Sequence, residues 1–231
     1  MQNNLITKRK VDITLCIDGT GSMRSCINSV KDNACRFYRE LKREMNDMGS
    51  EFDILRIKVI VFRDFKCDGR NAMVESRFFE LPADDNEFSA YLDGIRSEGG
   101  VDENAAVLEA IYKAMTSHYI APGPKARELI VLFADTTAIP LGVRGNCPGY
   151  PKDMVDADGL LETWMCVQSR PSQLRERNKR LVMFAPKGSC YEDMLQTYNR
   201  SRFIPVEIHR GLDDVSFDSI MSVIAASASS V

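Results

Sequence analysis

Residues 11–22 decide the fold, and they read Val-Asp-Ile-Thr-Leu-Cys-Ile followed by Asp-Gly-Thr-Gly-Ser. The first part is mostly apolar and rich in β-branched residues, which is typical of a strand in a sheet. The second part places Gly19 and Gly21 among oxygen-bearing side chains, and glycine lets a backbone turn tightly. We therefore predict a strand over 11–17 that ends in a polar loop.

Strands alternate with helices along the rest of the chain. From Ile27 to Met48, apolar residues recur every three or four positions, which predicts one long amphipathic helix that ends at Gly49. Further strands are predicted over 54–62, 73–81, 128–134, 180–185 and 203–208, and helices over 87–95, 103–118, 159–169, 191–198 and 213–226. The pattern predicts an α/β fold with a doubly wound, mostly parallel sheet and helices on both faces. The short connection before 73–81 makes that strand an antiparallel edge strand.

Composition indicates one globular domain. The chain has 231 residues, 44% of them hydrophobic, and a formal net charge of -3, which gives no global attraction for nucleic acid. We divide it into a polar N-terminal extension over 1–10 and a single domain over 11–231, with a Gly- and Pro-rich loop insertion over 138–158. No signal sequence or membrane-spanning run is evident, so we expect a soluble cytoplasmic protein that binds no membrane. The seven cysteines form no Cys-x-x-Cys pair, which favours reduced thiols.

A basic cluster precedes and enters the predicted strand over 180–185. It consists of Arg170, Arg175, Arg177, Lys179 and Arg180. We interpret the cluster as a solvated connector, with anion binding as the alternative.

Three loops carry the residues that suggest chemistry. Asp18, Thr20 and Ser22 follow the first strand, Asp102 ends a Gly-Gly-Val-Asp loop, and Asp135 follows the strand over 128–134. Ligand sites of doubly wound sheets lie at the carboxyl ends of the strands, and hard cations such as Mg²⁺ prefer carboxylate, hydroxyl and water oxygens. These five residues therefore predict a divalent-cation site.

Four of these residues also have a purely structural interpretation. Ser22 and Asp102 are residue types that cap helices. Asp135 is a turn former, and Thr20 would then only fill its loop. Capping and ligation are compatible, so both interpretations stay open.

The three loops resemble those of von Willebrand factor A domains of bacterial type. Asp18-x-Thr20-x-Ser22 is similar to the first motif of the metal-ion-dependent adhesion site of that family, Gly99-Gly100-Val101-Asp102 to its second loop, and Phe133-Ala134-Asp135 to its third. The resemblance implies that Thr20 and Ser22 ligate the cation through hydroxyls, that Asp18 and Asp135 act directly or through water, and that Asp102 takes the second-loop position. Thr20 replaces the usual Ser, and Asp102, which adds a charge, replaces the usual Thr.

The resemblance implies a metal-dependent protein-interaction module rather than an enzyme. Mg²⁺, or another divalent cation such as Mn²⁺ or Ca²⁺, would hold an Asp or Glu carboxylate of a protein partner. Bacterial members often act beside ATPases, kinases or phosphatases in stress and defence systems.

Two other functions remain as alternatives. Ile17-Asp18-Gly19-Thr20 is similar to the nucleophile loop of haloacid dehalogenase phosphoryl-transfer enzymes, but the nucleophile position holds Cys16 instead of Asp. The other alternative is a structural von Willebrand factor A domain with a vestigial site.

Overall fold

The computed structural model describes residues 7–97, 104–119, 123, 125–187, 190–210, 212 and 215–230. A seven-stranded sheet forms its centre, in the order β3-β2-β1-β6-β8-β9, with β4 also pairing with β2. Its strands are β1 (Thr7–Asp18), β2 (Ser50–Phe62), β3 (Met73–Glu75), β4 (Phe79–Leu81), β6 (Ala126–Phe133), β8 (Lys179–Pro186) and β9 (Ser201–Val206). A separate pair consists of β5 (Asn104–Ala105) and β7 (Thr137–Ala138). Strands β2, β1, β6, β8 and β9 are mutually parallel, whereas β3 and β4 run antiparallel to β2.

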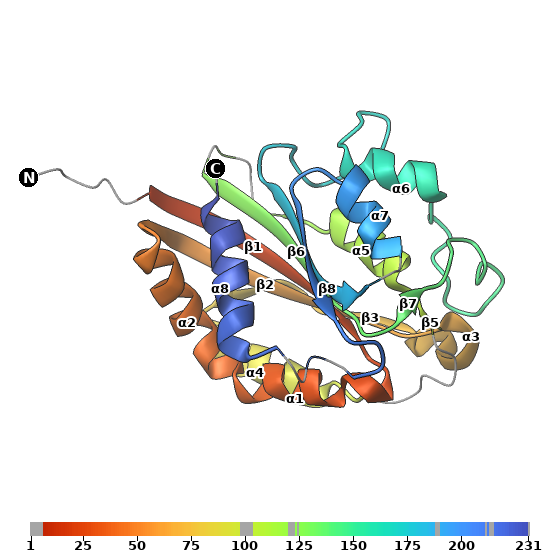
Figure 1. The fold of residues 1–231 in the computed structure, drawn as a ribbon, viewed down its shortest axis with the longest axis horizontal. Coiled ribbons are helices and arrows are strands. Elements are labelled where there is room, and N and C mark those ends of the chain that lie inside the picture. The colour runs from red at the N-terminus through yellow and green to blue at the C-terminus, as the bar shows by residue number, and fades with distance from the viewer. Residues whose placement is uncertain are drawn as a thin grey trace, which may run out of the picture.

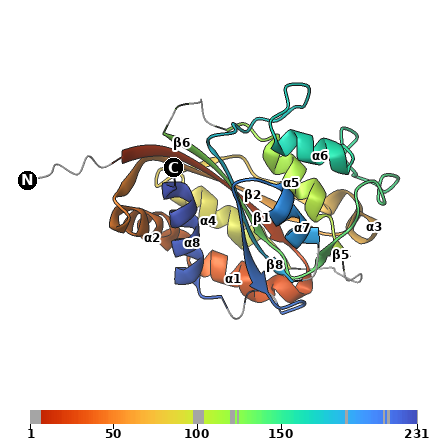
Figure 2. The ribbon, with the colours of Figure 1, turned by 45° about the horizontal axis from the view of Figure 1, so that its top comes forward.

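Helices cover both faces of the sheet (Figures 1 and 2). One face packs against α1 (Arg24–Asp32), α2 (Ala34–Asp47), α4 (Asp85–Gly94) and α8 (Phe217–Ser229). The other face packs against α5 (Val107–Met115), α6 (Ala157–Trp164) and α7 (Cys190–Thr197). All residues of β6 and β8 are buried, as expected for central parallel strands covered on both sides. The predicted α/β class, with its mostly parallel sheet and antiparallel edge, is confirmed.

The two edges of the sheet differ. The predicted edge strand over 73–81 is divided into β3 and β4, because Ser76 between them exchanges hydrogen bonds with Val59 through its own N–H and side-chain oxygen. At the opposite edge, Pro205 within β9 lacks the N–H that a further strand would need.

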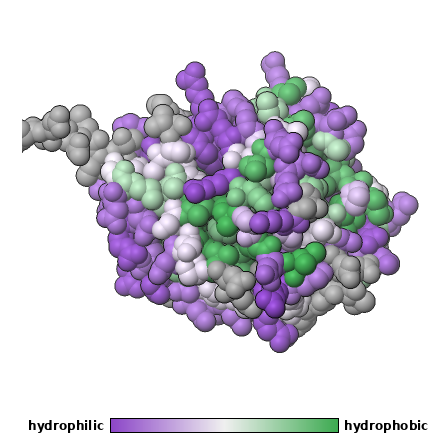
Figure 3. Space-filling model, viewed as in Figure 1, coloured by the Kyte–Doolittle hydropathy of each residue, from purple (hydrophilic) through white to green (hydrophobic). Residues whose placement is uncertain are grey.

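Figure 3 shows apolar side chains gathered in the middle of the face that is seen in Figure 1.

Several predicted boundaries need correction. The long helix after the first loop is divided at Asn33 into α1 and α2, and it is preceded by a short 3₁₀ turn, η1 (Gly21–Met23). The short connection before the predicted strand over 73–81 contains α3 (Phe65–Asp68) and η2 (Gly69–Asn71). The strand predicted to begin at residue 11 already begins at Thr7.

The cysteines whose side chains are described are free thiols: Cys16, Cys26, Cys67, Cys147, Cys166 and Cys190. Their state agrees with the predicted reduced thiols. Within the described residues, no helix combines the length and apolar character that crossing a bilayer requires.

Candidate functional site

Two buried carboxylates lie at the carboxyl ends of neighbouring parallel strands. Asp18 is the last residue of β1, and Asp135 follows β6 by two residues. The strands pair up to Ile17 and Phe133. This pairing brings the two acidic residues to the same end of the parallel strands, the end that lies toward β5, β7 and α3 in Figure 1. Both aspartates are fully buried. The expected position at the strand ends is therefore observed for these two residues.

A chain of hydrogen bonds links four of the five predicted site residues. The backbone N–H of Thr20 donates to Asp18 Oδ1 at 2.9 Å, and the hydroxyl oxygens of Thr20 and Ser22 lie 3.3 Å apart. Ser22 Oγ then donates to Asp135 Oδ1 at 3.1 Å. The first and third loops thus meet through their own side chains.

The capping interpretation is wrong for Ser22. Ser22 lies inside η1, whose N-cap residue is Thr20, and its hydroxyl donates to Asp135 Oδ1. Helix α5 begins at Val107 with Ala106 at its N-cap position, so the helix start predicted near residue 103 is wrong.

Glycine is required at position 19 because the first loop lies directly against β2. A Cβ on Gly19 would lie 2.7 Å from Val61 Cγ1 and 2.9 Å from the Arg63 guanidinium carbon. The Gly19 N–H donates to Phe62 O at 2.8 Å, and Arg63 Nε donates back to Gly19 O at 3.2 Å. The Arg63 guanidinium also donates to Arg96 O, which ties the first loop to the segment that leads toward the second.

Asp102, the fifth predicted ligand, lies outside the described residues. The chain just after it is placed, however. Asn104 in β5 pairs with Thr137 in β7, and Thr137 Oγ1 donates to Asn104 Oδ1. The residue two positions after Asp102 is therefore joined to the residue two positions after Asp135.

Burial gives the site its electrostatic character. Burial, with a smaller contribution from the nearby Asp135 carboxylate, raises the pKa of Asp18 to about 6. Hydrogen bonds from Thr136 and Thr20 act in the opposite direction. Among the described residues, no lysine or arginine forms a salt bridge with Asp18. A bound cation would supply the missing positive charge.

The donor set fits a hard divalent cation. Carboxylate and hydroxyl oxygens converge from Asp18, Thr20, Ser22 and Asp135, and none of these is a soft sulfur or nitrogen ligand. In the described part of the chain, no three His, Cys, Asp or Glu side chains gather at one point, so the carboxylates here number two. Hydroxyls, water and an incoming ligand would have to complete the coordination.

Thr136 is a site residue that the sequence interpretation missed. Its hydroxyl donates to Asp18 Oδ2 at 2.6 Å, so it bonds the carboxylate oxygen that Thr20 leaves free. Its carbonyl accepts a hydrogen bond from the buried Tyr191 hydroxyl at 2.8 Å. The only signal in the sequence was the position of Thr136 directly after Asp135.

The long loop over 139–156 is anchored beside the site. Arg144 forms two hydrogen bonds with Asp64, at 2.7 and 2.9 Å, and Asp64 is almost fully buried. The Tyr150 ring contacts Phe65 edge-on, with ring centres 5.2 Å apart. The loop is thereby fixed against α3, which follows β2 next to the candidate site.

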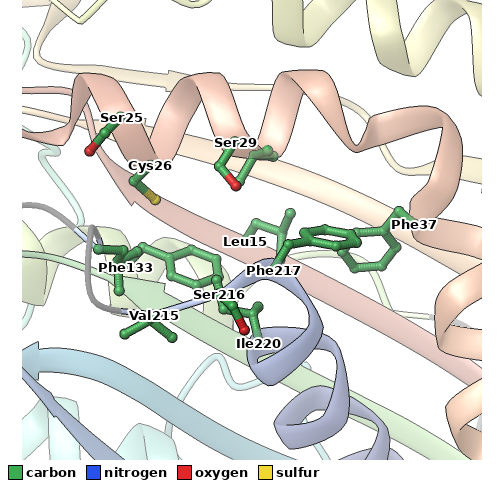
Figure 4. A pocket seen from close by; sticks show the side chains of 12 residues that line it. Leu15, Ser25, Cys26, Ser29, Phe37, Phe133, Val215, Ser216, Phe217 and Ile220 are labelled. Carbon is green, nitrogen blue, oxygen red and sulfur yellow. The ribbon is translucent and has the colours of Figure 1, made fainter.

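A cavity of about 230 Å³ separates α1 from the start of α8 (Figure 4). Leu15, Phe133 and Phe217 supply apolar walls, and Ser25 and Ser29 of α1 supply hydroxyls. The described residues that line it include no carboxylate and no amine.

Comparisons with known proteins show the fold alone. No family model matches the sequence, and no curated protein matches it. The chain is similar in structure to the pilus adhesin SpaC from Lactobacillus rhamnosus GG in its open conformation, with a TM-score of 0.51 and 10% identity. A second SpaC structure gives a TM-score of 0.53, also at 10% identity. Each match covers 95% of this chain and 30% of the adhesin, so the chain spans under a third of the length of that protein.

Proposed function

We propose that this chain is a metal-dependent binding domain of the von Willebrand factor A type, in which a divalent cation holds an acidic group of a protein partner. The observation that carries the proposal is the meeting of Asp18, Thr20, Ser22 and Asp135 at the carboxyl ends of β1 and β6. Two buried carboxylates lie there, and each accepts a hydrogen bond from a hydroxyl, Asp18 from Thr136 and Asp135 from Ser22. The fold shared with part of a pilus adhesin is compatible with a binding role.

Mg²⁺ is the cation that this donor set suits best. Two ionised carboxylates, Asp18 and Asp135, would offset its double charge, while the hydroxyls of Thr20 and Ser22 would add neutral ligands. Mg²⁺ normally keeps several of its six positions for water or for a ligand oxygen. An Asp or Glu side chain of the partner would replace one of these waters, and the loop over 139–156 would shape the surroundings.

The phosphoryl-transfer alternative gains no support from the geometry. Cys16, at the position where such an enzyme carries its nucleophilic aspartate, is fully buried and directs its thiol to Ala110 O at 3.8 Å. Burial also raises the pKa of this thiol far above its ordinary value.

A calorimetric Mg²⁺ titration with two matched variants tests the site. Ser22→Ala removes a hydroxyl that would contact the cation, so we expect a loss of Mg²⁺ affinity of about tenfold or more. Ser25→Ala removes an exposed hydroxyl from the same segment, three residues further along α1, and should leave the affinity unchanged. Equal affinities in both variants would exclude Ser22 from the metal site.

The acidic partner group is tested with a simple probe. A fluorescent peptide with a single glutamate is titrated in Mg²⁺ and in EDTA, beside the same peptide with glutamine. We expect the glutamate peptide to bind weakly when Mg²⁺ is present and not to bind in EDTA, and the glutamine peptide not to bind in either solution. Equal binding of both peptides would contradict recognition of a carboxylate by the cation.

A further inference from the structure

Four arginines form a row across the sheet, at the end opposite the candidate metal site. Arg9, Arg127, Arg180 and Arg202 come from β1, β6, β8 and β9, one from each neighbouring parallel strand. The strand pairing aligns Val11 with Arg127, Leu129 with Arg180, and Val182 with Arg202. Since Val11, Leu129 and Val182 all pack into the core beneath α8, the four arginines lie on that same face. We call them the arginine row.

Three members of the row are buried against the C-terminal end of α8. Arg9, Arg127 and Arg180 are only 6%, 4% and 6% exposed. Arg9 donates to Ser229 O at 2.8 Å, and Arg127 donates to Ser230 O at 3.0 and 2.6 Å. Arg180 donates to the Ser230 hydroxyl at 2.8 Å. Figure 1 shows this end of α8 beside the beginning of β6.

The basic cluster predicted to be a solvated connector is only partly solvated, since Arg177 is exposed while other members are paired or buried. Arg175 pairs with Glu128, Lys179 is fully buried and pairs with Glu176, and Arg180 belongs to the buried row.

In the described part of the chain, no acidic side chain balances the positive charge of the row. Within the described residues, none of the four arginines has a carboxylate within salt-bridge distance. Their known acceptors are carbonyls and hydroxyls, and a helix C-terminus contributes only about half a negative charge. Burial, together with the repulsion from Arg9, Arg180 and Arg200, lowers the pKa of Arg127 to about 10. Buried charges of one sign are costly unless an opposite charge joins them.

An open groove gives solvent access to the row. The groove has a volume of about 310 Å³, and its walls include Arg180, Arg200 and Arg202 from the sheet end and Ser227 and Ser230 from the end of α8. Among the residues that the structure describes, the one carboxylate within salt-bridge distance of the Arg200 guanidinium is that of Glu176, at 3.9 Å, and both side chains are partly exposed. Three arginines and two serines thus line a space larger than one small anion.

We propose that this groove binds a small tetrahedral oxyanion of the phosphate class. Guanidinium groups present paired N–H donors whose geometry matches the oxygens of such an anion, and their hydrogen bonds to an ionised acceptor are stronger than those between neutral groups. Arg180, Arg200 and Arg202 would hold the anion, and Arg9 and Arg127 would add to the positive field from within. The site is independent of the proposed metal function, since it lies at the other end of the strands.

Titration with inorganic phosphate tests the proposal, with EDTA present so that no metal contributes. Ionic strength is held constant with sodium chloride, because general screening would otherwise imitate binding. We expect phosphate, unlike chloride, to raise the unfolding midpoint progressively with the logarithm of its concentration above the dissociation constant, and calorimetry to give that constant. Arg202→Gln changes an exposed residue and should raise that constant about tenfold, the equivalent of roughly 1.4 kcal/mol.

The control is Arg39→Gln, an exposed arginine on α2, which should bind phosphate like the unmodified chain. Two results would overturn the proposal. One is a midpoint that phosphate raises no more than chloride does, as it would be if a carboxylate of the chain itself already neutralised the row. The other is an equal dissociation constant for Arg202→Gln and Arg39→Gln.

Discussion

Ser22 Oγ donates a hydrogen bond to Asp135 Oδ1 at 3.1 Å, although 113 residues separate the two positions in the chain. This bond joins the loop after β1 to the loop after β6 and needs no metal to do so. A hydrogen bond of this kind contributes only about 1 kcal/mol net. The loops are therefore placed in advance by the sheet, and a cation would exchange one weak contact for several stronger ones.

Asp18→Asn should stabilise the metal-free protein while abolishing its response to Mg²⁺. The folded-state pKa of Asp18 lies near 6, above its ordinary value of 3.8. The folded protein therefore loses stability as pH rises through 6, because the buried carboxyl group then becomes ionised. Asparagine removes that charge and is nearly the same size. At pH 8 in EDTA we expect the unfolding free energy to increase by roughly 1 to 3 kcal/mol. Urea unfolding measures it, and a less stable variant would show that burial of Asp18 is not costly.

Gly19→Ala should destabilise the fold and weaken Mg²⁺ binding together. The new methyl group would lie 2.7 Å from Val61 Cγ1, so either the loop or β2 must shift. Overpacking of this kind costs about 1 to 3 kcal/mol. Gly94→Ala is the matched control, since nothing lies within 4 Å of its Cβ position. Thermal unfolding that ranks the two variants equally would contradict the close approach of the first loop to β2.

Glu109→Gln should remove a pH dependence of stability near neutrality. Glu109 in α5 is 1% exposed, and within the described residues its Oε2 has no hydrogen-bond partner. Burial raises its pKa from 4.5 to about 7, with a smaller contribution from Asp64 and an opposing hydrogen bond from Tyr150. The folded state therefore holds this proton between those values, and stability falls as pH rises through the window.

The glutamine variant should match the unmodified protein at pH 5 and exceed its unfolding free energy by roughly 1 to 3 kcal/mol at pH 8. Chemical unfolding at both pH values provides the measurement. A difference that does not change with pH would mean that Glu109 does not titrate in this range.

The sequence predicts the sheet well because strand patterns and strand ends are local features. The apolar run that ends at Asp18 and the buried run before Asp135 became neighbouring parallel strands, and their loops meet as expected. The break between α1 and α2 was not predicted, because the apolar spacing continues through Asn33. The role of Thr136 was missed for a different reason, since its hydroxyl bonds a carboxylate from another strand.

The arginine row could not be predicted from the sequence for a similar reason. Its members are scattered from Arg9 to Arg202, and only the strand order places them side by side. Lys179 and Arg180 belong to a cluster that resembles an ordinary solvated segment, yet strand β8 takes both into the interior.

Crystallography with Mn²⁺ tests the proposed metal centre most directly. Mn²⁺ takes the same oxygen ligands as Mg²⁺ and gives an anomalous signal at its absorption edge. The account predicts one strong anomalous peak within ligand distance, about 2 to 2.4 Å, of oxygens from Ser22 and from at least one of Asp18 and Asp135. If the crystals bind Mn²⁺ elsewhere, while Ser22 still donates to Asp135 with no peak between them, the proposed metal centre is wrong.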